Sequence, residues 1–115
     1  MVKSVTSLTG SGLKDWLIQR VSAVYLALYL IGLFAYIGCH QPMTFDVWHA
    51  FFQTTVVQIL TALAIFMFVL HAWIGIWTVT TDYIQSTVVR LSVQVLVALF
   101  LSTQLIWGFM IVWGQ

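Results

Sequence analysis

Most side chains in this sequence that could take part in chemistry lie in one stretch, from His71 to Tyr83. The stretch begins within an uncharged apolar segment, and Asp82 and Tyr83 stand at the polar edge of that segment. His71 is the one histidine between Ala50 and Thr81, a range that contains no Asp, Glu, Lys or Arg. An ionisable residue within a membrane span is energetically costly, so it points to a functional site with a partner to be found.

Two roles suit His71. Small residues share its helical face, with Gly75 one turn later and Ala64 two turns earlier, so a flat group or another helix can approach closely. A haem iron needs a neutral imidazole nitrogen that faces such an apolar slot. A histidine inside a membrane also forms hydrogen bonds that link helices. Spacing alone leaves both roles open, and the structural link is the commoner one.

The count of histidines limits how a haem could be held. A six-coordinate b-type haem needs two axial ligands, and the chain contains His40, His49 and His71. His49 would lie about 33 Å from His71 along a continuous helix, so these two cannot bind one iron. His40 falls in a turn on the other side of the membrane. A haem here is therefore five-coordinate, or another subunit supplies its second ligand. His40 and His49 are expected to be surface histidines at the interface.

Asp82 and Tyr83 stand where the helix leaves the lipid, on the same predicted side as Arg20 and Arg90. A phenol hydroxyl can donate a hydrogen bond to a quinone carbonyl, and a carboxylate near an arginine can hold or relay protons. Each residue also has an ordinary role, since Tyr83 suits a membrane interface and Arg20 suits a basic anchor at the lipid surface. The residue types leave a quinone site and a plain surface both open.

The composition places the whole chain in lipid. Of its 115 residues, 62% are hydrophobic and 6% are charged, whereas a soluble domain has about 25% charged residues. A soluble fold of this length buries only about two thirds of its chain surface, which could not hide so much apolar area. The net charge of +1, without a basic run, indicates no nucleic-acid partner. The single Cys39 excludes an internal disulfide and a CxxC motif.

The hydrophobic pattern predicts an all-α integral membrane protein with three transmembrane helices in a single domain, 1–115. The spans are expected at about 16–38, 47–79 and 90–113. The uncharged run 50–81 would be about 48 Å long as one helix, so it must tilt or extend beyond the lipid. The first apolar segment is too long for a signal peptide and no cleavage site follows it, so we expect it to be retained.

The basic residues predict the orientation of the spans. They all fall on one side, either before the first span or between the second and third, and they are Lys3, Lys14, Arg20 and Arg90. The positive-inside rule therefore places the N-terminus in the cytoplasm and the C-terminus outside, in the periplasm of a bacterium.

Polar residues inside the spans bear on the class of protein. Gln58, Gln94 and Gln104 are expected to form hydrogen bonds between helices. A small transporter or channel subunit is a competing class, because a lone histidine in the membrane can relay protons. The sequence lacks the paired membrane charges and the internal repeat that are typical of transporters.

Together these residues resemble the small hydrophobic membrane anchor of bacterial succinate dehydrogenase, which is respiratory complex II. The most specific feature is a histidine inside the membrane followed about three turns later by an Asp-Tyr pair, and the resemblance covers most of the chain. The matching residues are His71-Ala72-Trp73-Ile74-Gly75-Ile76-Trp77, Thr81-Asp82-Tyr83, Asp15, Arg20-Val21-Ser22-Ala23, Val47-Trp48, Arg90-Leu91 and Val112-Trp113-Gly114.

The resemblance implies a set of sites. One haem b is expected between this chain and a second membrane anchor subunit, with one histidine from each, so that His71 is an axial ligand of the haem iron. Arg20 matches an arginine near the haem propionates. The resemblance also implies a ubiquinone site near the cytoplasmic face, where Tyr83 bonds the quinone and Asp82 supports it, while Asp82 and Arg20 tune charge and proton supply.

The resemblance further implies partners and a location. The expected partners are the second membrane anchor, an iron-sulfur subunit and a flavoprotein subunit, in a bacterial inner membrane. Succinate would be oxidised elsewhere in that complex, so the chain is not expected to be catalytic alone. Two alternatives stay open, namely a structural anchor that binds no cofactor and an anchor of fumarate reductase.

Overall fold

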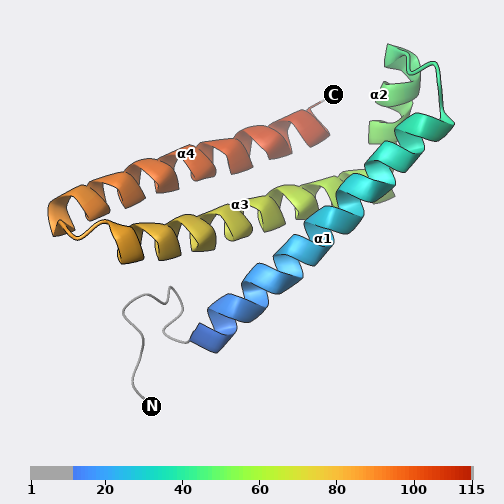
Figure 1. Cartoon of the computed structure of the whole chain (residues 1–115). Coiled ribbons are helices and arrows are strands. Elements are labelled where there is room, and N and C mark those ends of the chain that lie inside the picture. The colour runs from blue at the N-terminus through green and yellow to red at the C-terminus, as the bar shows by residue number, and fades with distance from the viewer. Residues whose placement is uncertain (1–11, 115) are drawn as a thin grey trace.

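The computed structural model describes residues 12–114, and over that range every regular element is a helix. Helices α1 (Gly12–Cys39), α3 (Thr55–Tyr83) and α4 (Thr87–Trp113) are each long and apolar enough to cross a membrane. The short helix α2 (Phe45–Gln53) joins α1 to α3 (Figure 1). The predicted all-α class and the count of three spans are confirmed. Lys3, which the predicted orientation also uses, lies outside the described residues.

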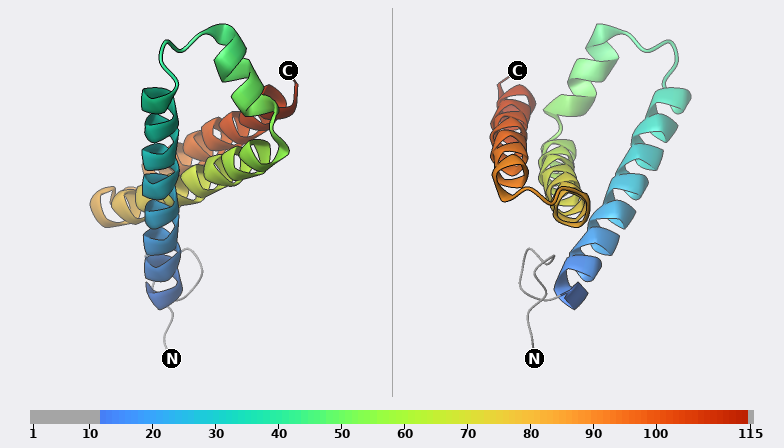
Figure 2. Two further views of the ribbon diagram at one scale, coloured as in Figure 1. Left: turned by 90° about the vertical axis from the view of Figure 1, so that its right-hand side faces the viewer. Right: turned by 60° about the vertical axis from the view of Figure 1, so that its left-hand side comes forward.

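Helix α3 is the centre of the arrangement. It packs against α1, α2 and α4, whereas α1 and α4 have little contact with each other. Helix α4 runs back alongside α3, while α1 crosses α3 at a wide angle, so that the start of α1 diverges from the end of α3 (Figures 1 and 2). The first turns of α1 and the α3–α4 turn therefore point in different directions.

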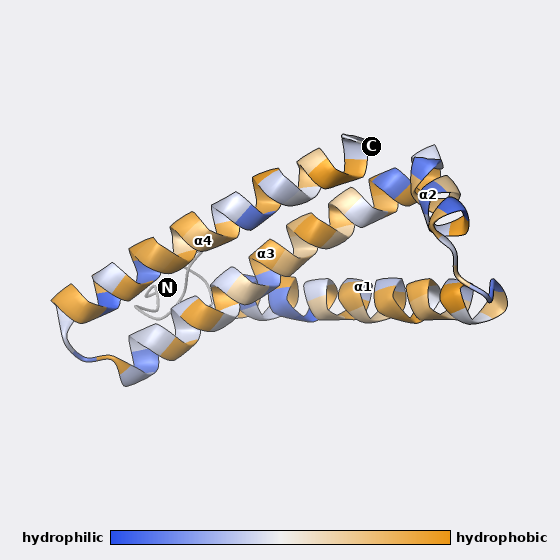
Figure 3. Ribbon diagram, turned by 90° about the horizontal axis from the view of Figure 1, so that it is seen from above, coloured by the Kyte–Doolittle hydropathy of each residue, from blue (hydrophilic) through white to orange (hydrophobic). Residues whose placement is uncertain are grey.

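Few side chains are buried within this arrangement. The buried hydrophobic residues are Ala64, Ile74, Leu101 and Val112. Apolar residues cover most of the surface of all three long helices (Figure 3), so the hydrophobic faces are turned outward as well as inward. A helix that is hydrophobic all round is typical of a membrane span, whose outer face meets lipid or another subunit.

The predicted second span is divided into two helices. Helix α2 ends at Gln53, and Thr54 has an extended backbone with φ −71° and ψ 127° before α3 begins. Threonine side chains compete for backbone hydrogen bonds, and a run of β-branched residues, Thr54-Thr55-Val56-Val57, weakens the helix at this point. The break turns the amphipathic α2 aside and leaves α3 about 43 Å long, so the full 50–81 run does not form one rod.

Two of the three glutamines link α3 to α4 as predicted. The Gln94 Nε2 donates a hydrogen bond of 2.9 Å to the Thr80 Oγ1, and both residues are buried. The Gln58 Nε2 donates to the carbonyl oxygen of Val112 at 3.4 Å. Gln104 forms no hydrogen bond to any residue that the structure describes, so its bond to another helix stays a prediction.

We expect Gln94→Leu to lower the free energy of unfolding by about 0.6–1.7 kcal/mol, the range measured for hydrogen bonds between membrane helices. The effect is small because the Thr80 hydroxyl keeps its own bond to the Ile76 carbonyl. Unfolding in mixed detergent micelles measures it. Gln104→Leu is the matched control in the same helix, and an equal loss of stability in both variants would contradict the assignment.

Candidate functional site

His71 is half-buried on α3 and faces α1. Its Nδ1 lies 3.1 Å from the Oγ of Ser22, and this hydrogen bond joins the two helices. Ser22 is 0% exposed, so water does not compete for the bond. The Nε2 of His71 forms no hydrogen bond to the described residues. One ring nitrogen thus acts as the structural link between helices, and the other has no hydrogen-bond partner among the described residues.

The small residues on the face of His71 admit α1. A Cβ atom added at Gly75 would lie 3.3 Å from the Gln19 Nε2 of α1, which is closer than most contacts of real Cβ atoms. Ala64 is buried beside residues of both α1 and α4. The slot that the sequence predicts along this face is therefore partly filled by another helix, which places α1 close enough for Ser22 to reach His71.

Arg20 shares a cleft with the same face of α3. The cleft between α1 and α3 has a volume of about 350 Å³, and Gly75 and Thr78 line it together with Arg20. The Arg20 guanidinium carbon lies 5.7 Å from the centre of the Trp16 ring, which is cation–π range. The structure thus gathers Arg20 and the His71 face on one side of the α1–α3 pair, at a position where a charged group can reach the surface.

We expect Gly75→Leu to destabilise the α1–α3 contact by about 1–3 kcal/mol, since the larger side chain must displace Gln19 and move α1 away from His71. Gly32→Leu is the matched control, because a Cβ added at Gly32 meets nothing within 4 Å. Unfolding of both variants in detergent measures the difference. Equal stabilities for the two variants would contradict the close approach.

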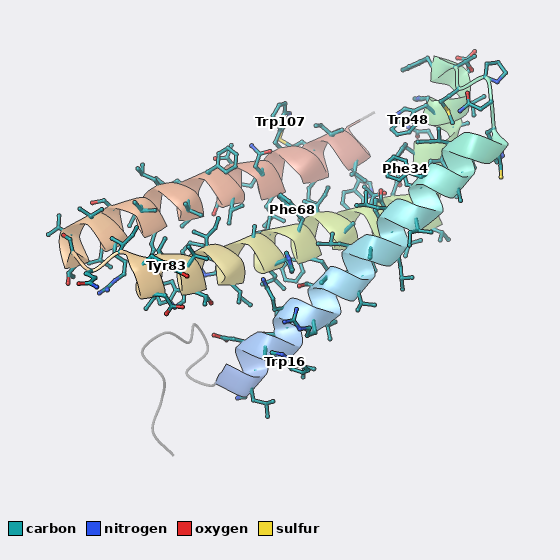
Figure 4. All side chains as sticks on the ribbon, in the orientation of Figure 1. Trp16, Phe34, Trp48, Phe68, Tyr83 and Trp107 are labelled. Atoms are coloured by element: carbon teal, nitrogen blue, oxygen red, sulfur yellow. The ribbon has the colours of Figure 1, made fainter. Side chains whose placement is uncertain are left out.

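Tyr83 and Asp82 lie apart from this cleft. Tyr83 is the last residue of α3 and is 80% exposed, and its hydroxyl forms no hydrogen bond to the described residues. The rise of the helix separates Tyr83 from His71 by about 18 Å. Trp16 and Tyr83 stand on the diverging ends of α1 and α3 (Figure 4). Tyr83 does not line the cleft that contains Arg20, which ends at Val79, one turn earlier on α3.

The arginine that lies nearest in the chain to the end of α3 is Arg90, in the first turn of α4. Its Nη1 donates a hydrogen bond of 3.5 Å to the carbonyl oxygen of Ile84, the residue after Tyr83. Arg90 was predicted on this side of the membrane but not as part of the site. The positive charge closest in the chain to the Asp82–Tyr83 pair is therefore supplied from the first turn of α4.

The other two histidines lie at the opposite end of the molecule. The His40 ring stacks on Tyr36 with 3.8 Å between ring centres, and its Nδ1 is 2.9 Å from the Tyr36 carbonyl oxygen. His49 contacts Phe45 and Gln53 within α2. Although the helix is broken at Thr54, α3 alone sets Thr55 about 24 Å from His71. His40 and His49 therefore order the turn around α2, and neither can join His71 on one iron.

Sequence reasoning missed Ser22 as part of the site. A serine within an apolar run carries no chemical signal by itself, and the periodicity of α1 does not indicate which of its faces meets His71. The one sequence signal was its place in the run Arg20-Val21-Ser22-Ala23. Among the residues that the structure describes, no group of three or more His, Cys, Asp or Glu side chains could hold a metal ion. Any metal at His71 therefore needs ligands from elsewhere.

Comparisons with known proteins identify the family of the chain. Residues 4–110 match the model of a family described as the succinate dehydrogenase/fumarate reductase transmembrane subunit. The chain is also 34% identical over 102 residues to the succinate dehydrogenase hydrophobic membrane anchor subunit of Coxiella burnetii (strain RSA 493 / Nine Mile phase I), and the match covers 89% of each chain. With its three apolar helices, the chain belongs to the family of succinate dehydrogenase/fumarate reductase transmembrane subunits, as a multi-pass hydrophobic membrane anchor.

Proposed function

We propose that this chain is the small hydrophobic anchor of a bacterial succinate:ubiquinone oxidoreductase, and that it provides one axial ligand of haem b and part of the ubiquinone site. The observation that supports this most directly is the geometry of His71. Its ring is held through Nδ1 by Ser22, and its Nε2 has no hydrogen bond to the described residues. A haem ligand needs one free ring nitrogen and one nitrogen that is fixed by the protein.

The residues around His71 fit a haem in two further ways. The imidazole is the only one at this level of the membrane, so the second axial ligand would come from the partner anchor subunit. Arg20 stands at the α1–α3 cleft, where a guanidinium can form charge-assisted hydrogen bonds to a propionate. Haem b, when bound, would accept and return one electron at a time. In this chain, Ser22 would orient the His71 ring, and Arg20 would bind the negatively charged propionate.

The proposed ubiquinone site lies at the end of α3. The Tyr83 hydroxyl is a free donor there, and it would donate a hydrogen bond to a quinone carbonyl. Asp82 and Arg90 would set the charge and the supply of protons as electrons arrive from the iron-sulfur subunit. We place Arg20 on the haem side, because it lines the α1–α3 cleft together with Gly75 and Thr78, whereas Tyr83 does not line that cleft.

The exposed Tyr83 would be covered by the partner subunits. Tyr83, at 80% exposure, is too accessible to hold a quinone away from water by itself. The iron-sulfur subunit and the second anchor would cover Tyr83, and the flavoprotein subunit would oxidise succinate. The basic residues Lys14, Arg20 and Arg90 fall at the Tyr83 end of the spans, which supports a cytoplasmic N-terminus in the bacterial inner membrane.

A structural anchor without a cofactor is the second candidate. The hydrogen bond between Ser22 and His71 favours it, because that bond links two spans without any ligand. Both candidates predict assembly with partner subunits, and only the first predicts haem. Fumarate reductase anchoring differs from the first candidate in the direction of electron flow.

Deletion of this chain and complementation test the anchor role. We expect membranes without the chain to lose succinate:ubiquinone reductase activity, while succinate oxidation with an artificial dye persists in the soluble fraction. Complementation with the wild-type chain should return both activities to the membrane. Full quinone reduction by membranes that lack the chain would contradict the proposed function.

A further inference from the structure

Ser22 occupies an unusual position for a serine in a membrane helix. It is 0% exposed in a chain whose spans bury few residues, and it lies at the crossing of α1 and α3. Its Oγ has two polar neighbours, the carbonyl oxygen of Gln19 at 3.1 Å and the Nδ1 of His71 at 3.1 Å. The arrangement of protons among these three groups decides which nitrogen of His71 can bind a ligand.

A hydroxyl group has one proton to donate and two lone pairs that accept. The backbone carbonyl oxygen of Gln19 can only accept, so the hydrogen bond between it and Ser22 uses the serine proton. The remaining lone pairs of the Ser22 Oγ then face the Nδ1 of His71, and a bond there needs a proton on Nδ1. A neutral imidazole that carries its proton on Nδ1 has its lone pair on Nε2.

We infer that Ser22 is a positioning residue for His71: it accepts a hydrogen bond from Nδ1–H, fixes the ring orientation and directs the Nε2 lone pair towards the ligand. This inference rests on the proposed role of His71 as a haem ligand. A histidine ligand is commonly held in this way by an acceptor on its other nitrogen, and the acceptor increases the basicity of the ligand. Here the acceptor belongs to a neighbouring helix of the same chain.

The packing around the pair explains why the bond is well defined. Gly75, one turn after His71, lets α1 approach until its Gln19 Nε2 stands 3.3 Å from the position of an added Cβ. That approach brings the short side chain of Ser22 within reach of the ring. Because Ser22 is 0% exposed and is the acceptor that faces Nδ1, the Nδ1–H would lose this acceptor when the hydroxyl is removed.

The test uses the complete complex, purified through a tag on this chain. The variants are Ser22→Ala, which removes the acceptor, and Ser22→Thr, which retains it. Ser92→Ala is the control, because the Ser92 Oγ forms the same kind of backbone bond, to the Val88 carbonyl oxygen, on an exposed face of α4. The readouts are the low-spin electron paramagnetic resonance spectrum, the haem midpoint potential and the retention of haem during washing.

We expect Ser22→Ala to raise the haem potential, since a less basic imidazole stabilises ferric iron less. Its low-spin resonance should shift, and its affinity for haem should fall 10–100-fold. Ser22→Thr and Ser92→Ala should have the haem potential, the low-spin resonance and the haem affinity of the wild type. If Ser22→Ala does not assemble, Ser22→Cys replaces it, because a thiol is a weak acceptor of similar size. The Cys variant should raise the potential relative to Ser22→Thr.

Two results would overturn the inference, and they can be told apart. A wild-type complex without haem would contradict the proposed function and the inference together. A wild-type complex with low-spin haem, and an unchanged potential and spectrum in Ser22→Ala or Ser22→Cys, would contradict the inference alone. In that case His71 would ligate the iron without help from Ser22.

Discussion

We expect Tyr83→Phe to lower succinate:ubiquinone reductase activity about 10²-fold, with assembly and haem content unchanged. The size of the effect is that of removing one proton donor from a site of proton-coupled reduction. The substitution deletes a single oxygen atom from an exposed ring whose hydroxyl bonds to no described residue, so the stability of the fold should not change. The measurement compares quinone reduction with dye reduction by the same preparation.

The control for this prediction is Tyr36→Phe. The Tyr36 ring stacks between His40 and Phe51 at the opposite end of the molecule, and its hydroxyl forms no hydrogen bond to the described residues. The control variant should keep full activity with both acceptors. Normal quinone turnover in Tyr83→Phe would remove Tyr83 from the quinone site, and equal losses with quinone and dye would show a defect in assembly instead.

The second large effect is expected for His71→Ala. This change removes one axial bond to iron, and no other histidine can replace it, because His40 and His49 stand at the far end of the molecule. The low-spin signal of a six-coordinate haem should therefore fall at least about tenfold in the isolated complex. Electron paramagnetic resonance of the oxidised complex measures the signal.

The matched controls for His71→Ala are His40→Ala and His49→Ala. Each removes an imidazole of the same size from the turn around α2, and each should leave the low-spin signal at the wild-type level. Loss of the signal in either control would show that the haem lies at the other end of the spans. A full low-spin signal in His71→Ala would leave His71 as the structural partner of Ser22.

The count of spans followed from sequence because hydropathy depends on composition over a long window. The break at Thr54 could not be predicted from sequence, since threonine and valine weaken a helix by only a few tenths of a kcal/mol each. The packing of α2 decides whether the helix breaks there. The prediction that His49 and His71 cannot bind one iron depended on their separation along a helix. The break at Thr54 does not change it, because α3 alone places Thr55 about 24 Å from His71.

The arrangement of the site could be predicted only in part. Arg20 and Tyr83 were correctly expected towards the same end of the spans, but sequence contains no measure of the angle at which α1 crosses α3. That crossing places Trp16 and Tyr83 on diverging ends of α1 and α3 (Figure 4), and Arg90 bonds to Ile84 just beyond the end of α3. The same crossing brings Ser22 to His71, a contact between residues far apart in the chain.

The most direct test of the account is the dithionite-reduced minus oxidised visible spectrum of the complex purified through a tag on this chain, with its subunits separated on a gel. We expect a sharp low-spin b-type band together with three partner subunits. Partners without a haem band would contradict the ligand role of His71 and leave a structural anchor. If neither haem nor partner subunits were found, the proposed function as a whole would be wrong.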